Sequence, residues 1–300
     1  MRRIGWFVAV LTLMCGCDWT ADGLARLEQK YPTDVADTVN PDAAVTDVTV
    51  ADSDNIPDVF GEAIGDASEP EAISAPLEGL WAVRLVSQGT IAPIGTPWAL
   101  TTTDLFLGEV SADESTLTLT FCGQTNVVDQ GSGPSDFGKA EVPAALEQAL
   151  RAAPIVIALP GDQTFGTPSV VWLWGLKDMA DPALDPIPES GSDARVFDQD
   201  QDGQVGVTMH VAMPEGDRYM VRRVVWQFDA GAFQGDANRF GGRLAFTADE
   251  KAYGASNTLL TTVANITPTP DASAYLMRRL DAAISCDALE ADQANLFDVP

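Results

Sequence analysis

The chain has 300 residues, with 44 Asp and Glu against 17 Lys and Arg, so its formal charge is −27 at pH 7. A chain this acidic repels a phosphate backbone, which excludes sequence-independent binding of DNA or RNA. A hydrophobic share of 46%, with seven Trp and twelve Phe, is enough for a substantial core. The chain has one His, which excludes any site that needs two imidazoles, such as the H-E-x-x-H zinc helix.

The charge divides the chain into three segments. Residues 1 to 17 carry two bases and no acid, which gives +2. Residues 18 to 78 carry fifteen acids and two bases, for −13, and residues 79 to 300 carry twenty-nine acids and thirteen bases, for −16. We expect a signal peptide over residues 1 to 16, a lipidated Cys17 with a linker over residues 17 to 78, and a globular domain over residues 79 to 300.

The N-terminus has the pattern of a secretory signal peptide. Met1-Arg2-Arg3 is followed by an apolar run over residues 4 to 14. A helix of that length is about 16 Å long, too short to cross about 30 Å of hydrocarbon. The run ends in Met14-Cys15-Gly16-Cys17, which resembles the lipobox of bacterial lipoproteins. The resemblance implies cleavage before Cys17, with a diacylglyceryl thioether on its sulfur and usually an acyl chain on its amine.

Several acyl chains on Cys17 exceed what stable membrane anchoring requires. We therefore expect an exported protein, lipid-anchored to a bacterial membrane, with the outer membrane or cell surface favoured. Asp18 resembles an inner-membrane retention signal of some bacteria, which leaves the inner membrane open. The alternative is an ordinary secretory signal cut nearby, which would release a free protein.

The segment from residue 32 to residue 78 is typical of a disordered tether. It contains twelve acids, no Lys or Arg, and one aromatic residue, Phe60. Such a segment buries too little apolar area to offset its chain entropy, and its like charges keep it extended.

The remaining residues predict a mainly β domain, an antiparallel β-barrel or sandwich with one short internal helix and a C-terminal helix. Residues 116 to 121 alternate Thr with Leu and Phe, the period of a half-buried strand. Further strands are expected at residues 81 to 85, 169 to 176, 205 to 211, 217 to 228, 239 to 247 and 258 to 266.

The first of these strands begins with Gly79-Leu80-Trp81. This tripeptide resembles the G-x-W of lipocalins, which are eight-stranded barrels that carry small apolar ligands in the barrel mouth.

Two helices are expected among the strands. The first runs from Pro143, which suits a first helical turn, to Ala152. The second runs over residues 272 to 285 after Asp271 as N-cap, with an i, i+4, i+7, i+8 stripe from Leu276 to Ile284.

Two cysteines remain once the signal peptide is cleaved and Cys17 is lipidated. They are Cys122, at the end of the Thr-alternating strand, and Cys286, after the expected last helix. In an oxidising compartment this even pair predicts a disulfide, and the alternative is two buried thiols.

A candidate metal site lies at residues 198 to 203, Asp-Gln-Asp-Gln-Asp-Gly. Carboxylates at i, i+2 and i+4 followed by Gly203 can turn three hard oxygens toward one point, which suits calcium. The segment resembles the first half of an EF-hand loop, which implies Asp198, Asp200, Asp202 and the backbone carbonyl of Gln204 as ligands. Met209 stands where that loop places its last Glu, so Asp193, Glu215 or Asp217 would have to complete the shell. The alternative is an acidic turn.

Other polar residues give no specific site. His210 lies on the polar face of its expected strand, and Arg218, Arg222 and Arg223 are expected to form surface ion pairs, with Arg222 and Arg223 on opposite faces.

Three hypotheses about function follow, and they assign no catalytic residue. The first is a lipid-anchored envelope protein with a non-catalytic, calcium-braced β domain that binds a partner or has a structural role; the partner beyond the membrane is undetermined. The second is a lipocalin-like carrier of a small apolar ligand, and the third is a carboxylate-dependent hydrolase.

Overall fold

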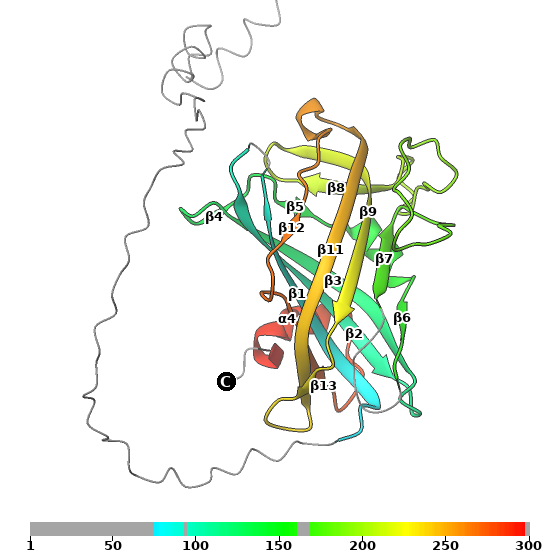
Figure 1. Ribbon diagram of the computed structural model, residues 1–300, viewed down its shortest axis with the longest axis vertical. Helices are drawn as coiled ribbons and strands as arrows, with labels where there is room; N and C mark the ends of the chain where they lie inside the picture. Colours follow the sequence, from blue (N-terminus) through cyan, green and yellow to red (C-terminus); the bar gives the residue numbers. More distant parts are fainter. Residues whose placement is uncertain (1–74, 93–94, 161–168, 298–300) are drawn as a thin grey trace, which may run out of the picture. The chain divides into compact units, whose positions relative to one another are not determined.

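The computed structural model describes residues 75–92, 95–160 and 169–297, all within the compact unit Ser68–Pro300. The predictions of a signal peptide, a lipobox with Cys17 and Asp18, and a disordered tether concern residues outside the described ones, apart from residues 75–78. Within the described residues, the mainly β prediction is confirmed (Figure 1).

One large antiparallel sheet makes up the domain (Figure 1). Its path runs β4-β3-β2-β1-β13-β11-β9-β8-β5, and β6, β7, β10 and β12 pair with β3, β9, β11 and β1. Among the described strands, no continuous ladder closes the sheet on itself. The longer strands are β1 (Gly79–Ile91), β2 (Trp98–Val110), β3 (Thr116–Asp129), β9 (Gly216–Phe228) and β11 (Arg239–Ala255). The shorter ones are β4 (Pro134–Ser135), β5 (Ala140–Glu141), β6 (Ile155–Ala158), β7 (Val170–Trp174), β8 (Val207–Val211), β10 (Ala232–Phe233), β12 (Thr267–Pro268) and β13 (Ala274–Arg279).

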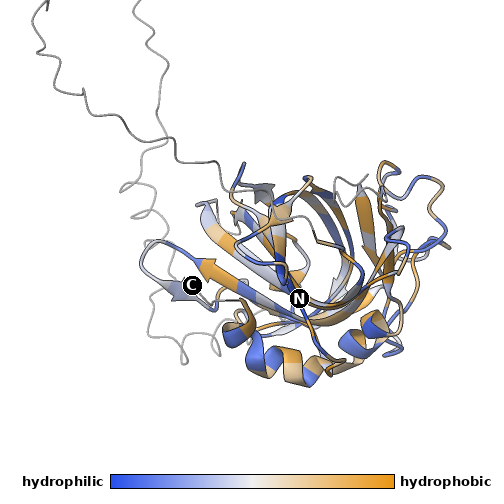
Figure 2. Ribbon diagram, turned by 90° about the horizontal axis from the view of Figure 1, so that it is seen from below, coloured by the Kyte–Doolittle hydropathy of each residue, from blue (hydrophilic) through white to orange (hydrophobic). Residues whose placement is uncertain are grey.

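The sheet curves so that one face of every long strand is buried in a shared core. Figure 2 shows the strands wrapped around this interior, with helices outside them. At one end the interior is filled by aromatic rings at centroid distances of 4.9 to 6.1 Å, namely Phe106, Phe121, Trp172, Trp174 and Trp226. Edge-to-face packing of such rings adds to the free energy gained by burying their area.

The start of the domain is fastened by Trp81 and Arg279. The guanidinium of Arg279 lies 4.3 Å from the ring centroid of Trp81, which is fully buried. Arg279 also donates to the backbone carbonyls of Pro76 and Glu78, and Trp81 Nε1 donates to Leu77 O at 2.8 Å. These contacts join the residues before β1 to β1 and to β13.

The short internal helix was predicted correctly and is α3 (Ala144–Arg151). In the chain it lies between β5, which pairs with β8, and β6, which pairs with β3. It therefore passes from one side of the open sheet to the other, and it buries Leu146 and Leu150 in the core.

The C-terminal helix exists, but its predicted position was wrong. Residues 274 to 279 form β13, which pairs with β1 and β11, and the helix is α4 (Cys286–Phe297). The stripe from Leu276 to Ile284 suggested a helix, but Tyr275 and Met277 alternate into the core with the period of a strand. As a strand, β13 pairs with the backbones of both β1 and β11, which a helix at this place could not do.

Two further differences concern strands. Residues 258 to 266 were expected to form a strand, but Thr258–Leu260 is a 3₁₀ helix, η1, capped by the Asn257 side chain. Strand β2 was not predicted, because three consecutive Thr and Asp104 interrupt its apolar alternation.

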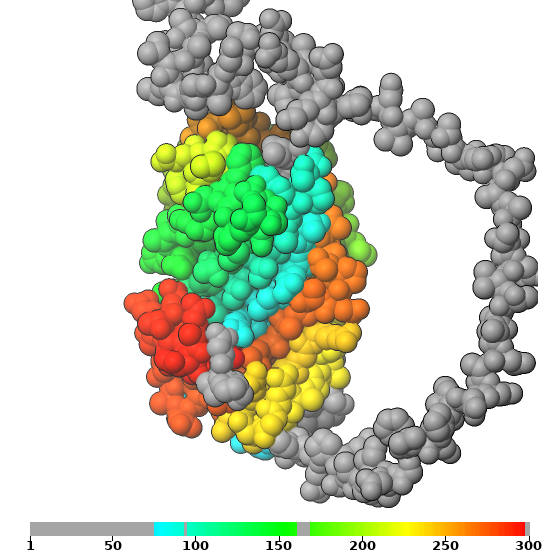
Figure 3. Space-filling view, turned by 90° about the vertical axis from the view of Figure 1, so that its left-hand side faces the viewer, coloured from blue at the N-terminus to red at the C-terminus, as the bar shows by residue number. Residues whose placement is uncertain are grey.

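Helix α4 (red in Figure 3) covers part of the outer face of the sheet. Its Leu289 and Phe297 contact Ala82 and Leu105, which point outward from β1 and β2. The Sγ atoms of Cys122 and Cys286 lie 2.06 Å apart, so a disulfide joins β3 to the first residue of α4. This is the pairing that the cysteine count predicted.

Candidate functional site

A cavity of about 640 Å³ lies inside the curved sheet. Its wall combines the last residue of β1, the first half of β2, the second half of β3, the ends of β5 and β8, the first half of β9, and residues 259 to 266. Antiparallel pairing places all of these at one end of the sheet, opposite the closed end of the β2–β3 hairpin. The cavity thus occupies the end that the aromatic cluster does not fill.

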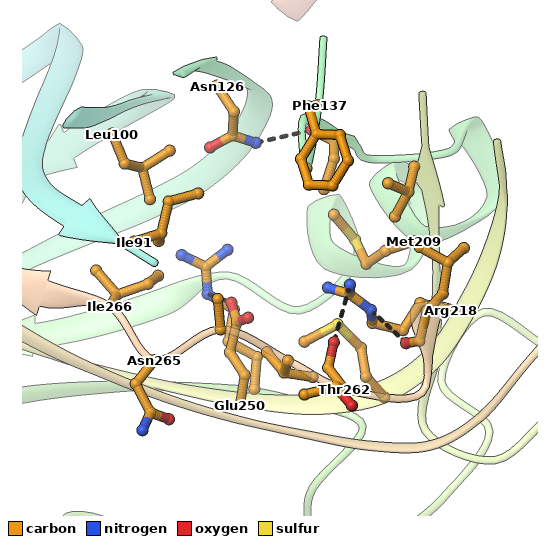
Figure 4. A pocket seen from close by; sticks show the side chains of 18 of the residues that line it. Ile91, Leu100, Asn126, Phe137, Met209, Arg218, Glu250, Thr262, Asn265 and Ile266 are labelled. Atoms are coloured by element: carbon orange, nitrogen blue, oxygen red, sulfur yellow. Dashed lines mark hydrogen bonds and ion pairs between the residues drawn. The ribbon is translucent and has the colours of Figure 1, made fainter. Parts of the chain in front are cut away.

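The wall of the cavity is mainly apolar (Figure 4). Apolar side chains around it include Ile91, Leu100, Phe137, Met209, Met220 and Ile266. Trp174 contributes to the lining and also stacks edge-on against Trp172 at 4.9 Å, so it separates the cavity from the filled part of the core.

A chain of hydrogen bonds runs along β2 and β3 beside the cavity. Thr102 Oγ1 donates to Asn126 Oδ1 at 2.8 Å, and Asn126 Nδ2 donates to Gln124 Oε1 at 3.1 Å. Gln124 Nε2 then donates to Asp104 Oδ1 at 2.6 Å. Asn126 Nδ2 also donates to the carbonyl of Ala140 on β5 at 2.9 Å, so this network spans the gap between β3 and β5.

Asp104 is an ionisable group in the interior. Its side chain points to the concave face of β2, and the residue is only 3% exposed. Burial raises the pKa of Asp104 from 3.8 to about 6, against the opposing effects of the Gln124 hydrogen bond and of Arg222.

Arg222 and Glu250 form a buried ion pair in the wall of the cavity. Arg222 Nε lies 3.2 Å from Glu250 Oε1, and the side chains are 9% and 15% exposed. The contact is an ion pair rather than a well-aligned hydrogen bond, since Arg222 Nε has no hydrogen-bond partner. The guanidinium also lies 5.0 Å from the ring centroid of Trp174.

Arg222 and Arg223 form ion pairs, but the expectation that these pairs lie on the surface was wrong. Arg222 and Arg223 are each 8% exposed. Arg223 pairs with Asp249 at 2.6 Å, and Arg222 with Glu250, which are neighbouring register positions on β9 and β11. Adjacent residues of a strand point to opposite faces, so Arg222 enters the cavity and Arg223 does not.

Arg218 lies near the segment that follows η1. Its Nε donates to Leu260 O at 3.0 Å and its Nη2 donates to Thr262 O at 3.4 Å (Figure 4). Burial lowers the pKa of Arg218, and the charge of Glu250 partly opposes this. Arg218 thus holds residues 260 to 262 against β9 and lines the cavity.

The acidic loop lies between β7 and β8. Ligand oxygens of Asp198, Asp200 and Asp202 lie within 4.8 Å of one another, close enough to hold one metal ion. Gln201 and Gly203 take the left-handed backbone conformation, with φ of 60° and 85°. These turns bring the three carboxylates to one side of the loop.

Asp200 is the innermost of the three carboxylates. Its Oδ2 accepts from Thr208 N at 2.9 Å, while its Oδ1 is buried without a hydrogen-bond partner. Burial and the charge of Asp202 raise the pKa of Asp200. A buried acceptor without a donor fits a cation.

The loop carboxylates also organise their own backbone. Asp198 accepts from the amides of Asp202 and Gly203, at 3.2 and 2.8 Å, and Asp202 accepts from Gln204 N at 2.8 Å.

The additional acids suggested from the sequence are not part of this cluster. Asp193 is paired with Arg195 at 2.8 Å, which lowers the pKa of its carboxyl to about 2. The Asp217 carboxylate lies 3.1 Å from Nδ1 of His210, the single His of the chain. Both side chains are half-exposed. Glu215 is exposed outside the cluster.

No protein-family model, curated protein or solved structure matches this chain. Among the described residues, no helix has the length and apolar character needed to cross a membrane.

Asp104 provides a test of the network through the pH dependence of stability. The unfolded carboxyl loses its proton near pH 4, whereas the folded one keeps it to about pH 6. The unfolded state therefore binds fewer protons between these values, and stability falls as pH rises through this window. The difference in pKa corresponds to about 3 kcal/mol.

Asp104→Asn keeps the acceptor oxygen but cannot ionise. We expect the stability of this variant not to fall as pH rises through this window. Urea unfolding should give equal stabilities for the variant and the wild type below pH 4, and a more stable variant at pH 7. Glu109→Gln removes an exposed carboxylate from the same strand and should leave the pH profile unchanged. Parallel profiles for the wild type and Asp104→Asn would contradict the assigned ionisation.

Proposed function

We propose that this domain binds a small, mainly apolar molecule in the cavity at the open end of its sheet. The observation that carries the proposal is a cavity of about 640 Å³, within the range of small-ligand sites, lined by apolar side chains and a few polar ones. A domain with a purely structural role would gain stability from filling this volume, since unfilled space costs packing energy.

The lining supports a ligand with an apolar body. Methionine and aliphatic side chains adapt to the shape of an apolar guest. Of the hypotheses from the sequence, the carrier of a small apolar ligand agrees best with this arrangement. The G-x-W resemblance at Gly79-Leu80-Trp81 points the same way.

We further propose that the chain is anchored to a bacterial envelope membrane through lipid on Cys17. The lipobox-like sequence supports the anchor. The acidic segment that follows would then separate the ligand-binding domain from the bilayer.

Calcium is the ion we propose for the loop of Asp198, Asp200 and Asp202. The donors are hard oxygens in a turned loop, and the backbone carbonyl of Gln204 is the proposed fourth ligand. A bound ion would offset the repulsion among the three carboxylates and brace the connection between β7 and β8.

A ligand-binding test can use the full chain carrying Cys17→Ser, which needs no detergent. We expect the fluorescence of N-phenyl-1-naphthylamine to rise saturably on binding. Ala264→Trp places a large side chain in the cavity wall and should weaken binding at least tenfold. Ala232→Trp, exposed on β10, is the matched control and should bind as the wild type does. The proposal fails if binding is not saturable or if both variants behave alike.

For calcium, the expected result is a rise in melting temperature of the wild type at millimolar Ca²⁺, because an ion that binds the folded state stabilises it. Asp200→Asn should abolish the shift and, without calcium, should be more stable than the wild type because repulsion is relieved. Glu215→Gln removes an exposed acid outside the cluster and should keep the full shift. An unchanged shift in Asp200→Asn would exclude this loop as the site.

The lipid anchor is testable by labelling cells that express the full chain with palmitate. We expect the wild type and Cys15→Ser to be labelled and membrane-bound, and Cys17→Ser to be unlabelled, because only Cys17 receives lipid. Label that persists in Cys17→Ser, or an unlabelled wild type released as free protein, would support the ordinary secretory signal instead.

A further inference from the structure

The charges around the cavity are unevenly shared between its two arginines. The ionisable side chains in the lining are Arg218, Arg222 and Glu250. The nearby carboxylate of Asp104 acts on Arg222, so the carboxylates gather around Arg222 and leave Arg218 less compensated. Both arginines come from the inward face of β9, four residues apart, which is about 13 Å along a strand.

Arg222 is already compensated by the protein. Glu250 lies 3.2 Å away, and Asp104 interacts with the same guanidinium electrostatically. Arg222 is also nearly buried. A second anion placed beside it would meet two carboxylates and would have to lose almost all its hydration, both of which are unfavourable.

Arg218 is in a different position. Its hydrogen bonds go to two backbone carbonyls, and among the described residues it has no carboxylate within ion-pair distance. Its pKa is lowered because burial disfavours its charge. The Arg218 guanidinium has five N–H donors, of which these two carbonyls use two.

The surroundings of Arg218 also suit the acidic end of an amphipathic molecule. The carbonyls that it contacts belong to Leu260, the buried last residue of η1, and to Thr262, which is exposed, so this part of the wall borders solvent at Thr262. An acid there keeps part of its hydration, while Ile91, Leu100 and Ile266 offer apolar contacts (Figure 4).

We propose that the cavity takes an amphipathic organic anion, with its acidic group against Arg218 and its apolar body in the cavity. This inference rests on the proposed ligand-binding function and specifies the class of ligand. The acid would supply a direct ion-pair partner, which the described residues do not provide for Arg218, since Glu250 acts on it from beyond ion-pair distance.

Two dyes of nearly the same shape test the inference on the full chain carrying Cys17→Ser. 1-Anilinonaphthalene-8-sulfonate is an anion, and N-phenyl-1-naphthylamine has the same aromatic body without the sulfonate. We expect the anionic dye to bind about tenfold more tightly at low salt, because hydrogen bonds to a charged group are strong. Its advantage should shrink as salt is raised.

Variants separate the charge of Arg218 from its structural contacts. Arg218→Gln should weaken the anionic dye about tenfold and leave the neutral dye within twofold, while Arg218→Lys should stay within threefold of the wild type for both. Arg243→Gln removes the same charge from an exposed position and should change neither affinity.

The outcomes distinguish the two proposals. Equal affinity for the two dyes, or equal weakening of both in Arg218→Gln, would overturn the anion inference while ligand binding stands. Failure of the anionic dye alone would likewise overturn only the anion inference. Failure of the neutral dye to bind saturably, or failure of Ala264→Trp to weaken it, would overturn the proposed function itself.

Discussion

The contact between Trp81 and Arg279 is the constraint on which the rest of the structure depends. Trp81 lies on β1 and Arg279 on β13, and the β1–β13 ladder is the seam between the two halves of the sheet. On one side of this seam lie β2 and β3, and on the other lie β11, β9 and β8. A partly exposed cation over an aromatic face contributes about 1 kcal/mol, and three backbone carbonyls receive hydrogen bonds from the same pair of side chains. If the seam opened, the two halves would no longer share a concave face.

The concave face of the sheet is covered differently at its two ends. Aromatic rings fill one end, and the other end carries Met, Ile, Asn, Thr and Arg side chains around an open volume. The boundary lies at Trp174, which contacts Trp172 on one side and Arg222 on the other. The buried carboxylates Asp104 and Glu250 are tolerated at this boundary because Gln124 and Arg222 supply a donor and a countercharge. A conventional core at one end thus supports a polar, cavity-forming region at the other.

Strand content was largely predictable from the sequence, because alternation in runs such as residues 116 to 121 reports directly on one buried face. Prediction was wrong at residues 272 to 285 and 258 to 266, where a short pattern fits either period and tertiary pairing decides between them. The turn that gathers Asp198, Asp200 and Asp202 was predictable, since local spacing is sufficient to bring them together. The cavity residues were not, because Asp104, Arg222 and Glu250 become neighbours only through the register of separate strands. One signal was available for Arg222 and Glu250: each occupies an inward position of a largely apolar alternation. Asp104 gave no such signal, because the inward positions of its strand also include Thr102.

The disulfide and α4 lie on the outer, convex side of the sheet, together with the contacts of Leu289 and Phe297. No part of this outer layer contributes to the lining of the cavity. Substitutions among the lining side chains therefore change the shape and charge of the cavity without altering the disulfide or the helix on the convex side. In evolutionary terms, the scaffold and the cavity are separable, and the lining can diverge while the scaffold is conserved.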